Sequence, residues 1–276
     1  MASVRDDAGP IKANGWRQGS VLPHSLVESL RNGNCVPERL ADCELWIVVS
    51  HDCDVTNPRF SVEPNVEIVP ARRMSGSDGN KHWGKSPREF QFDVKIDGGE
   101  QTFFDICVHD RLVLSRQILL DCLPDDSRQP SERFLRAISH WLSKRYVRAA
   151  FPDAFNDRTR DAAIRLRQSF KKSGHLIEGI YMVVVDDELE EDETYKIIVY
   201  AVMHDDEYAS SSSRKAAQLL VDQVESRLSG CEGVTVEIAC LKPEAEITLS
   251  DLRLLKRWDF DYLSLRDPDS EDLPRH

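Results

Sequence analysis

The sequence predicts an α+β protein that consists of a small β-barrel, a helical connector and a β-β-α-β domain. Short apolar or alternating segments separated by turn residues fill the first 125 positions, which is typical of small barrels. A helical pattern rich in Lys and Arg follows. Strand-like runs around one long helical pattern form the rest. We therefore expect three parts, residues 1–125, 126–175 and 176–276.

Length and composition limit the class of protein. The 276 residues are 41% hydrophobic and 30% charged, which is enough apolar material for real cores. The net charge of −12 argues against uniform coating of nucleic acid or acidic membranes. No signal peptide is readable, no apolar run reaches the roughly 18 residues that span a bilayer, and the seven cysteines show no disulfide spacing. We expect a cytoplasmic protein without membrane contact.

The strands of the first part can be read from their patterns. Residues 45–49 form a continuous apolar, β-branched run, as in a strand buried on both faces. Residues 66–69 and 90–96 alternate between apolar and polar. The turn at 97–99 returns the chain into a strand at 102–108.

The later parts alternate helices and strands. One helix is expected after Pro130, because Phe134, Ile138 and Trp141 share one face. A second helix is expected at 157–172. The third part should contain strands at 180–185, 195–202 and 234–240, a helix at 214–228 and an acidic loop at 186–193.

Five segments of the first part carry a family resemblance, in this order: residues 17–22, 45–50, 66–70, 90–96 and 104–111. They resemble the MazF/PemK toxin family, whose fold is an SH3-like barrel. That family is associated with sequence-specific RNA cleavage, so the resemblance implies an SH3-like barrel and raises an endoribonuclease-like activity.

The residues usually implicated in that cleavage are an Arg at the entry to the second strand and a Thr after a Val-Pro pair. Here the entry reads Glu44-Leu45, and Ala71-Arg72-Arg73 follows Pro70. The resemblance therefore implies the barrel more than the activity. The Ser-His-Asp-Cys-Asp string at 50–54 and segments 85–88 and 151–156 resemble uncharacterised bacterial and phage-associated proteins.

Segment 50–54 is the best candidate site, because a charged cluster directly follows a buried strand. If the strand continues, His51 and Cys53 share one face while Asp52 and Asp54 share the other. Cys53 could be a nucleophile activated by His51, in an endoribonuclease-like set with Asp52 and Arg72.

Two other interpretations of this segment remain open. His51, Cys53, Cys107 and His109 would make a zinc site if their strands are neighbours. Alternatively, Cys53 is a buried core residue, and the polar side chains close a turn before Pro58.

The helical stretch predicts a binding surface. Residues 128–172 hold twelve Lys or Arg and four Asp or Glu. The basic, aromatic loop around 72–88 could add contacts to RNA or a protein partner. The alternatives are a solvated helix face, pairing with the acidic loop, and a Trp folded back over the barrel end. The candidate contact residues are Arg73, Trp83, Lys85, Arg88, Arg145, Arg148, Arg160, Arg167 and Lys171.

These observations favour a regulatory or partner-binding component of a prokaryotic or phage conflict system, of the defence or toxin–antitoxin type. It would bind nucleic acid, RNA more than DNA, or a protein. The alternatives are an endoribonuclease-like effector and a zinc-stabilised structural protein. ATPase, zincin and α/β-hydrolase motifs are absent from the sequence.

Overall fold

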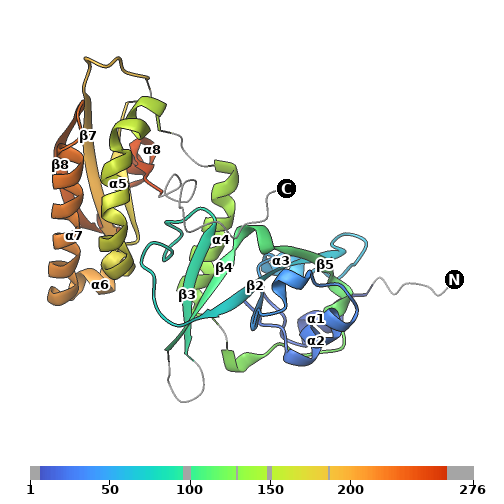
Figure 1. Ribbon diagram of the computed structural model, residues 1–276. Helices are drawn as coiled ribbons and strands as arrows, with labels where there is room; N and C mark the ends of the chain where they lie inside the picture. The colour runs from blue at the N-terminus through green and yellow to red at the C-terminus, as the bar shows by residue number, and fades with distance from the viewer. Residues whose placement is uncertain (1–6, 96–100, 129, 148–150, 186, 260–276) are drawn as a thin grey trace. The chain divides into compact units, whose positions relative to one another are not determined.

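The computed structural model describes residues 7–95, 101–128, 130–147, 151–185 and 187–259. The chain divides into two compact units. Unit 1 comprises Met1–Gly76 and Arg88–Ser143, and unit 2 comprises Ser77–Pro87 and Lys144–His276. Helices and two separate sheets confirm the α+β class (Figure 1).

Unit 1 is built on a five-stranded antiparallel sheet, in which β2 is the central strand. The path runs β1-β2-β4-β3, and β5 also pairs with β2. The apolar β1 is buried along its whole length, as its sequence predicts. Its strands are β1 (Leu45–Val48), β2 (Asn65–Met74), β3 (Glu89–Lys95), β4 (Gln101–Cys107) and β5 (Leu112–Ser115), and its helices are α1 (Gly9–Ala13), α2 (His24–Asn32), α3 (Asp52–Val55), most of α4 (Glu132–Val147), η1 (Glu38–Leu40), η2 (Val108–Asp110), η3 (Arg116–Leu119) and η4 (Asp126–Arg128).

The expected closed barrel is not found among the described strands, whose pairing path does not return on itself. A helix packs instead on the aromatic face of β3. The rings of Phe90 and Trp141 lie 5.6 Å apart, and those of Phe92 and Phe134 lie 6.1 Å apart. The aromatic face of β3 is thus buried by α4.

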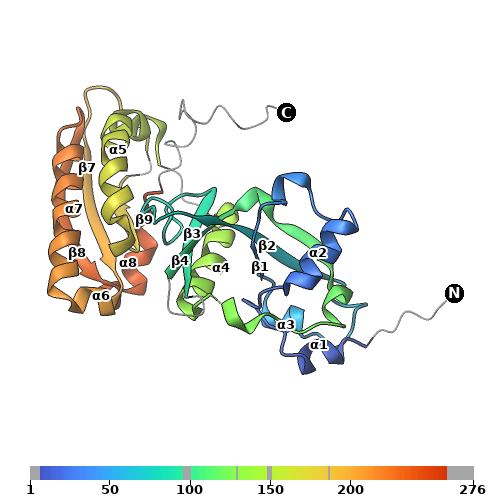
Figure 2. The same cartoon turned by 60° about the horizontal axis from the view of Figure 1, so that its bottom comes forward.

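Unit 2 contains a four-stranded sheet in the order β8-β7-β6-β9. The strands β6 and β7 form an antiparallel pair, and β8 lies parallel to β7 after a helical crossover. The helices α5 and α7 lie side by side against this sheet (Figures 1 and 2). The elements are α5 (Asp153–Ser173), η5 (Gly174–Leu176), β6 (Gly179–Val183), β7 (Tyr195–Met203), α6 (Asp205–Ala209), α7 (Ser211–Ser229), β8 (Val234–Pro243), η6 (Glu244–Glu246), α8 (Leu249–Leu254) and β9 (Lys256–Arg257).

The predicted strands and the β-β-α-β order of the third part are present, with β9 as an addition. The two units do not follow the three expected stretches, because α4 lies mostly in unit 1 and α5 lies in unit 2. Residues Ser77–Pro87, named the strap below, belong to unit 2 although β2 and β3 on either side belong to unit 1. None of the helices in the described ranges is both long and apolar enough to cross a bilayer.

Candidate functional site

The predicted locus at 50–54 is the start of a short helix and not the end of a strand. His51 caps α3, and its Nδ1 accepts a hydrogen bond from the backbone N–H of Cys53 at 3.2 Å. Since a helix turns by about 100° per residue, the expected split into a His51/Cys53 face and an Asp52/Asp54 face is wrong. His51, Asp52 and Cys53 are exposed, so the interpretation of Cys53 as a core residue is also wrong.

Hydrogen bonds from more distant parts of the chain hold the exposed segment in place. The backbone N–H of Gln18 donates to Asp52 Oδ1 at 2.6 Å, and Ser50 Oγ accepts from the N–H of Glu67. Arg116 is entirely buried and lies over the ring of Phe60. Its guanidinium donates to five backbone carbonyls, those of Asp54, Val55, Asn57, Arg59 and Glu63. A buried Arg with this many acceptors fixes the chain that follows α3.

The expected hydrogen bond between Asn57 and a backbone amide is present, but the amide follows Pro58 and does not precede it. Asn57 Oδ1 accepts from the backbone N–H of Arg59 at 3.0 Å, which is the Asx-type bond that the turn interpretation predicts.

Arg72 lies far from His51, so the expected four-residue catalytic set is not assembled. Arg72 forms ion pairs with Asp42 and Asp110. It follows Ala71, whose carbonyl accepts from the N–H of Glu44 at the entrance to β1. His51 is seven residues beyond Glu44, a strand length of roughly 20 Å.

The expected zinc ligands do not come together either. The strands β1 and β4 pair with opposite edges of β2, and Cys107 ends β4 while His109 lies in η2. Within the described residues, no group of three or more His, Cys, Asp or Glu side chains is placed to hold a metal ion. Burial raises the pKa of the Cys107 thiol, which disfavours the thiolate that zinc requires.

The strap carries two residues that sequence reasoning expected at the surface, and both are buried. Trp83 is 9% exposed and Lys85 is 1% exposed. Trp83 Nε1 donates to the carbonyl of His175 at 2.8 Å, and its ring meets that of His204 edge-on with centroids 4.7 Å apart. Trp83 is therefore folded back, but onto His175 and His204 of unit 2 and not over a barrel end, and neither side chain is exposed.

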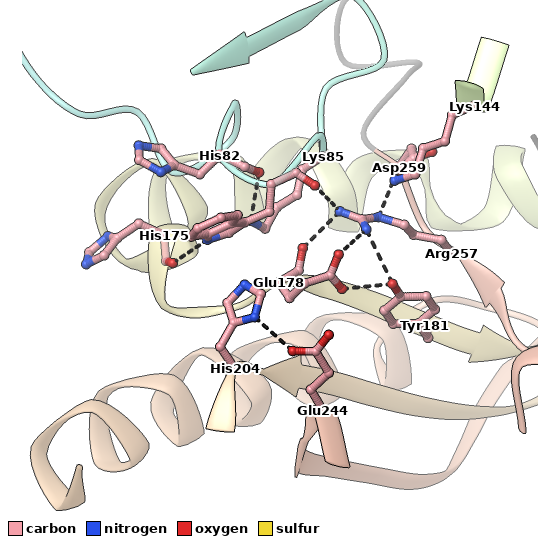
Figure 3. Close-up of polar contacts among 11 residues, drawn as sticks. His82, Lys85, Lys144, His175, Glu178, Tyr181, His204, Glu244, Arg257 and Asp259 are labelled. Atoms are coloured by element: carbon pink, nitrogen blue, oxygen red, sulfur yellow. Dashed lines mark hydrogen bonds and ion pairs between the residues drawn. The ribbon is translucent and has the colours of Figure 1, made fainter. Parts of the chain in front are cut away.

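Lys85 lies in a group of buried charged and phenolic side chains, named the charge cluster below, with Arg257 at its centre (Figure 3). Arg257 donates to Glu178 Oε1 at 2.5 Å, to the Tyr181 hydroxyl at 3.3 Å and to the carbonyl of Trp83 at 2.5 Å. Its Nε lies 3.3 Å from Asp259. The charge cluster comprises Lys85, Lys144, Glu178, Tyr181, Arg257 and Asp259.

The electrostatics of the charge cluster favour fixed charges on two of its members. Burial acts to raise the pKa of Glu178, but the charge of Arg257 and the hydrogen bond from Tyr181 lower it to about 2. Burial acts to lower the pKa of Arg257, but the charge of Glu178 raises it above its ordinary value. Burial and the charge of Arg257 lower the pKa of Lys85 well below its ordinary value. Arg257 and Glu178 therefore stay ionised, while Lys85 is driven toward its neutral form.

Sequence reasoning missed Glu178, Tyr181, Arg257 and Asp259. They lie far in sequence from Lys85, and their spacing follows no motif. Only the pairing of β6 with β9 brings Tyr181 opposite Arg257.

The helix α5 presents its basic residues in two different ways. Arg158 is partly buried and donates to the carbonyls of Leu189, Glu190, Glu193 and Gly233. Arg160 forms an ion pair with Asp157 on the same helix. The solvent-facing basic residues of the last three turns are Arg165, Arg167, Lys171 and Lys172.

The remaining predicted contact residues are dispersed. Arg73 is exposed on β2, and Arg88 is partly buried just before β3. Arg148 and the side chain of Arg145 lie outside the described residues.

Comparison of the chain with known protein families, with curated proteins and with solved structures gave no match.

Proposed function

We propose that the protein is a non-catalytic, nucleic-acid-binding component of a prokaryotic or phage conflict system, and that it binds RNA in preference to DNA. The observation that carries the binding proposal is the run of four exposed cations on the last three turns of α5. The acidic residues of this helix, Asp153, Asp157 and Asp161, all lie in its first half. The second half therefore offers a positive strip that phosphates can neutralise.

The acidic loop at 187–193 does not neutralise this strip. Glu188 accepts hydrogen bonds from the backbone N–H groups of Asp153 and Ala154, so it caps the N-terminal end of α5. Arg158 binds carbonyl groups of the same loop in the first two turns. The loop and the exposed cations thus lie at opposite ends of a helix that spans Asp153–Ser173.

A purely structural explanation is that cations near a helix C-terminus complement the helix dipole. That effect is worth about 0.3–1 kcal/mol and falls off within the last turn. Lys171 and Lys172 satisfy it. Arg165 lies further back, beyond the last turn, and nucleic-acid binding gives it a role that the dipole does not.

The experiment measures the affinity of single-stranded RNA by fluorescence anisotropy between 50 and 200 mM salt. The double variant Arg167→Glu/Lys171→Glu is compared with Lys215→Glu/Arg227→Glu, which changes the same charge at exposed positions of α7. We expect the α5 variant to bind roughly tenfold more weakly or worse. Its salt slope should be less steep by about 1.4, at about 0.7 per lost phosphate contact.

The control variant should stay close to the wild type in both quantities. Equal losses in the two variants would show that overall charge, and not α5, sets the affinity. Absence of binding by the wild type at 50 mM salt would reject the proposal for RNA.

The place in a conflict system is supported by the resemblance of segments of unit 1 to MazF/PemK toxins. Plaque counts of phage on cells with and without the gene test it, and the Arg167→Glu/Lys171→Glu variant links any protection to the binding strip. Identical plaque counts in all three strains would remove this part of the proposal.

A second candidate function, an endoribonuclease-like activity, is favoured by one observation: His51 and Cys53 are exposed, and a hydrogen bond joins the Cys53 N–H to the His51 ring. It predicts cleavage of RNA by the purified protein, lost in His51→Ala and in Cys53→Ser. Intact RNA after prolonged incubation with the wild type would exclude it.

A further inference from the structure

The strap is attached to unit 2 at both of its ends. Near its start, the N–H of Gly79 donates to the carbonyl of Lys171 at 3.0 Å, and Asn80 Nδ2 donates to the carbonyl of Arg167 at 3.2 Å. Near its end, the carbonyl of Trp83 accepts a hydrogen bond from Arg257, and Lys85 belongs to the charge cluster. Trp83 has a φ of +57°, a left-handed conformation that a bulky residue adopts only when its surroundings hold it there.

The charges around Lys85 already balance without it. Glu178 and Asp259 supply two negative charges, and Arg257 and Lys144 supply two positive charges. Lys85 Nζ donates to the carbonyl of His82 at 3.0 Å, within the strap itself. A proton on Lys85 would add a third buried cation to two carboxylates, and a buried charge without compensation is strongly unfavourable.

We propose that the strap is an acid-released latch, docked while the Lys85 amine is neutral and released from unit 2 when that amine takes up a proton. The step is a simple protonation, in which the amine lone pair binds a proton from water. The released amine is then hydrated, which removes the cost of burying its charge.

Among the described residues, four charged groups act most strongly on Lys85. Lys144 of α4 and Arg257 of β9 remain cationic. Glu178, ahead of β6, keeps its negative charge because its pKa is about 2. Asp259, after β9, acts to raise the pKa of Lys85, but burial and the charge of Arg257 lower that pKa more strongly. Tyr181 stays protonated, because burial and the charge of Glu178 raise its pKa.

His175 of η5 also contributes to acid release. Burial and then the charge of Lys85 lower the pKa of His175, while Glu207 of α6 acts to raise it. Its protonation would place another cation near Lys85, so it weakens docking in the same sense. Acid therefore acts through added positive charge at both residues.

Release has a local structural consequence. The carbonyls of Arg167 and Lys171 lose their strap donors, and the Trp83 indole loses its bond to His175. The core strand β7 is not attached to the strap by these bonds, so it should remain intact. Below the pH at which docked Lys85 titrates, release should become about tenfold more favourable per pH unit for each proton bound.

The test is amide hydrogen exchange of the full chain at several values between pH 8 and pH 5, corrected for intrinsic exchange rates. In the wild type, strap amides should lose protection as the pH falls, while amides of β7 keep theirs. Lys85→Met mimics the neutral side chain, so as the pH falls its strap should lose much less protection than the wild-type strap and only the part that His175 contributes. Lys85→Arg is always charged, so its strap should be unprotected even at pH 8.

Three outcomes would overturn the proposal. One is a wild-type strap whose protection does not change with pH. Another is a Lys85→Met variant that loses protection as the wild type does, which would assign the effect to the histidines alone. The third is a Lys85→Arg variant docked normally at pH 8, and this result decides the question even if Lys85→Met fails to fold.

Discussion

The substitution Gly79→Ala probes the contact between the strap and the end of α5. Gly79 and Gly174 lie back to back, and a Cβ added at Gly79 would stand 2.1 Å from the carbonyl oxygen of Phe170 and 2.7 Å from the backbone nitrogen of Gly174. Both obstacles are backbone atoms, so no side-chain rotation relieves the clash. Ordinary contact begins near 3.4 Å, so the strap must retreat by 1.3 Å.

A retreat of this size breaks the hydrogen bonds from Gly79 and Asn80 to α5, at about 1 kcal/mol each. Overpacking adds about 1–3 kcal/mol. The lower entropy of the unfolded Ala chain returns about 0.4–1 kcal/mol. We therefore expect Gly79→Ala to lower the free energy of unfolding by about 2–4 kcal/mol.

Urea denaturation measures this loss, and hydrogen exchange shows whether the strap is the part released. Gly76→Ala is the matched control, because a Cβ there meets nothing within 4 Å. It should change stability by no more than about 0.5 kcal/mol. If the two variants prove equally stable, the strap does not pack against α5 as described.

Three further predictions concern buried charges. Arg116→Met should lower the free energy of unfolding, measured by urea denaturation, by about 3–5 kcal/mol, because five carbonyls lose a charged donor. Arg111→Met removes a half-exposed ion pair and should lower it by under about 1 kcal/mol. Similar losses in the two variants would contradict the role given to the Arg116 hydrogen bonds. Glu178→Gln leaves Arg257 without its main partner, so it should cost about 3 kcal/mol at pH 7. Because the folded pKa of Glu178 (about 2) lies below the ordinary 4.5, this cost should vanish as the pH falls from about 5 to 2; a loss independent of pH would refute that origin. For Lys85 the folded pKa is also lowered, but the group is a base, so the unfolded chain binds more protons than the folded chain. The free energy of unfolding of the wild type should therefore rise by about 1.4 kcal/mol between pH 9 and 10. Lys85→Met should lack this rise, and an unchanged slope in the variant would mean that Lys85 is not the titrating group.

Local patterns were sufficient for much of the fold. The apolar run that became β1 and the alternation that became β3 follow from side-chain direction along a single strand. The same holds for the amphipathic spacing of α5. In each case the information lies within one or two turns or a few strand residues, so the sequence alone specifies the element.

The candidate site was only partly predictable. The sequence correctly marked 50–54 as a polar segment after a buried strand, but the choice between strand and helix depends on contacts with Gln18 and Arg116, which are distant in sequence. The expected barrel depended on strand closure, which the pairing of the described strands does not provide, and α4 packs on the aromatic face of β3. Register across β2 separates His51 from Arg72 and from Cys107.

The sequence by itself determined an α+β chain, the positions of its main strands and a basic second half of α5. Tertiary structure decided that Trp83 and Lys85 are buried while His51 and Cys53 are exposed. The physical reason is that burial of an ionisable side chain depends on groups that are distant in sequence. For Lys85, burial and the charge of Arg257 favour the neutral amine, and Arg257 and Glu178 come near it only when the chain is folded.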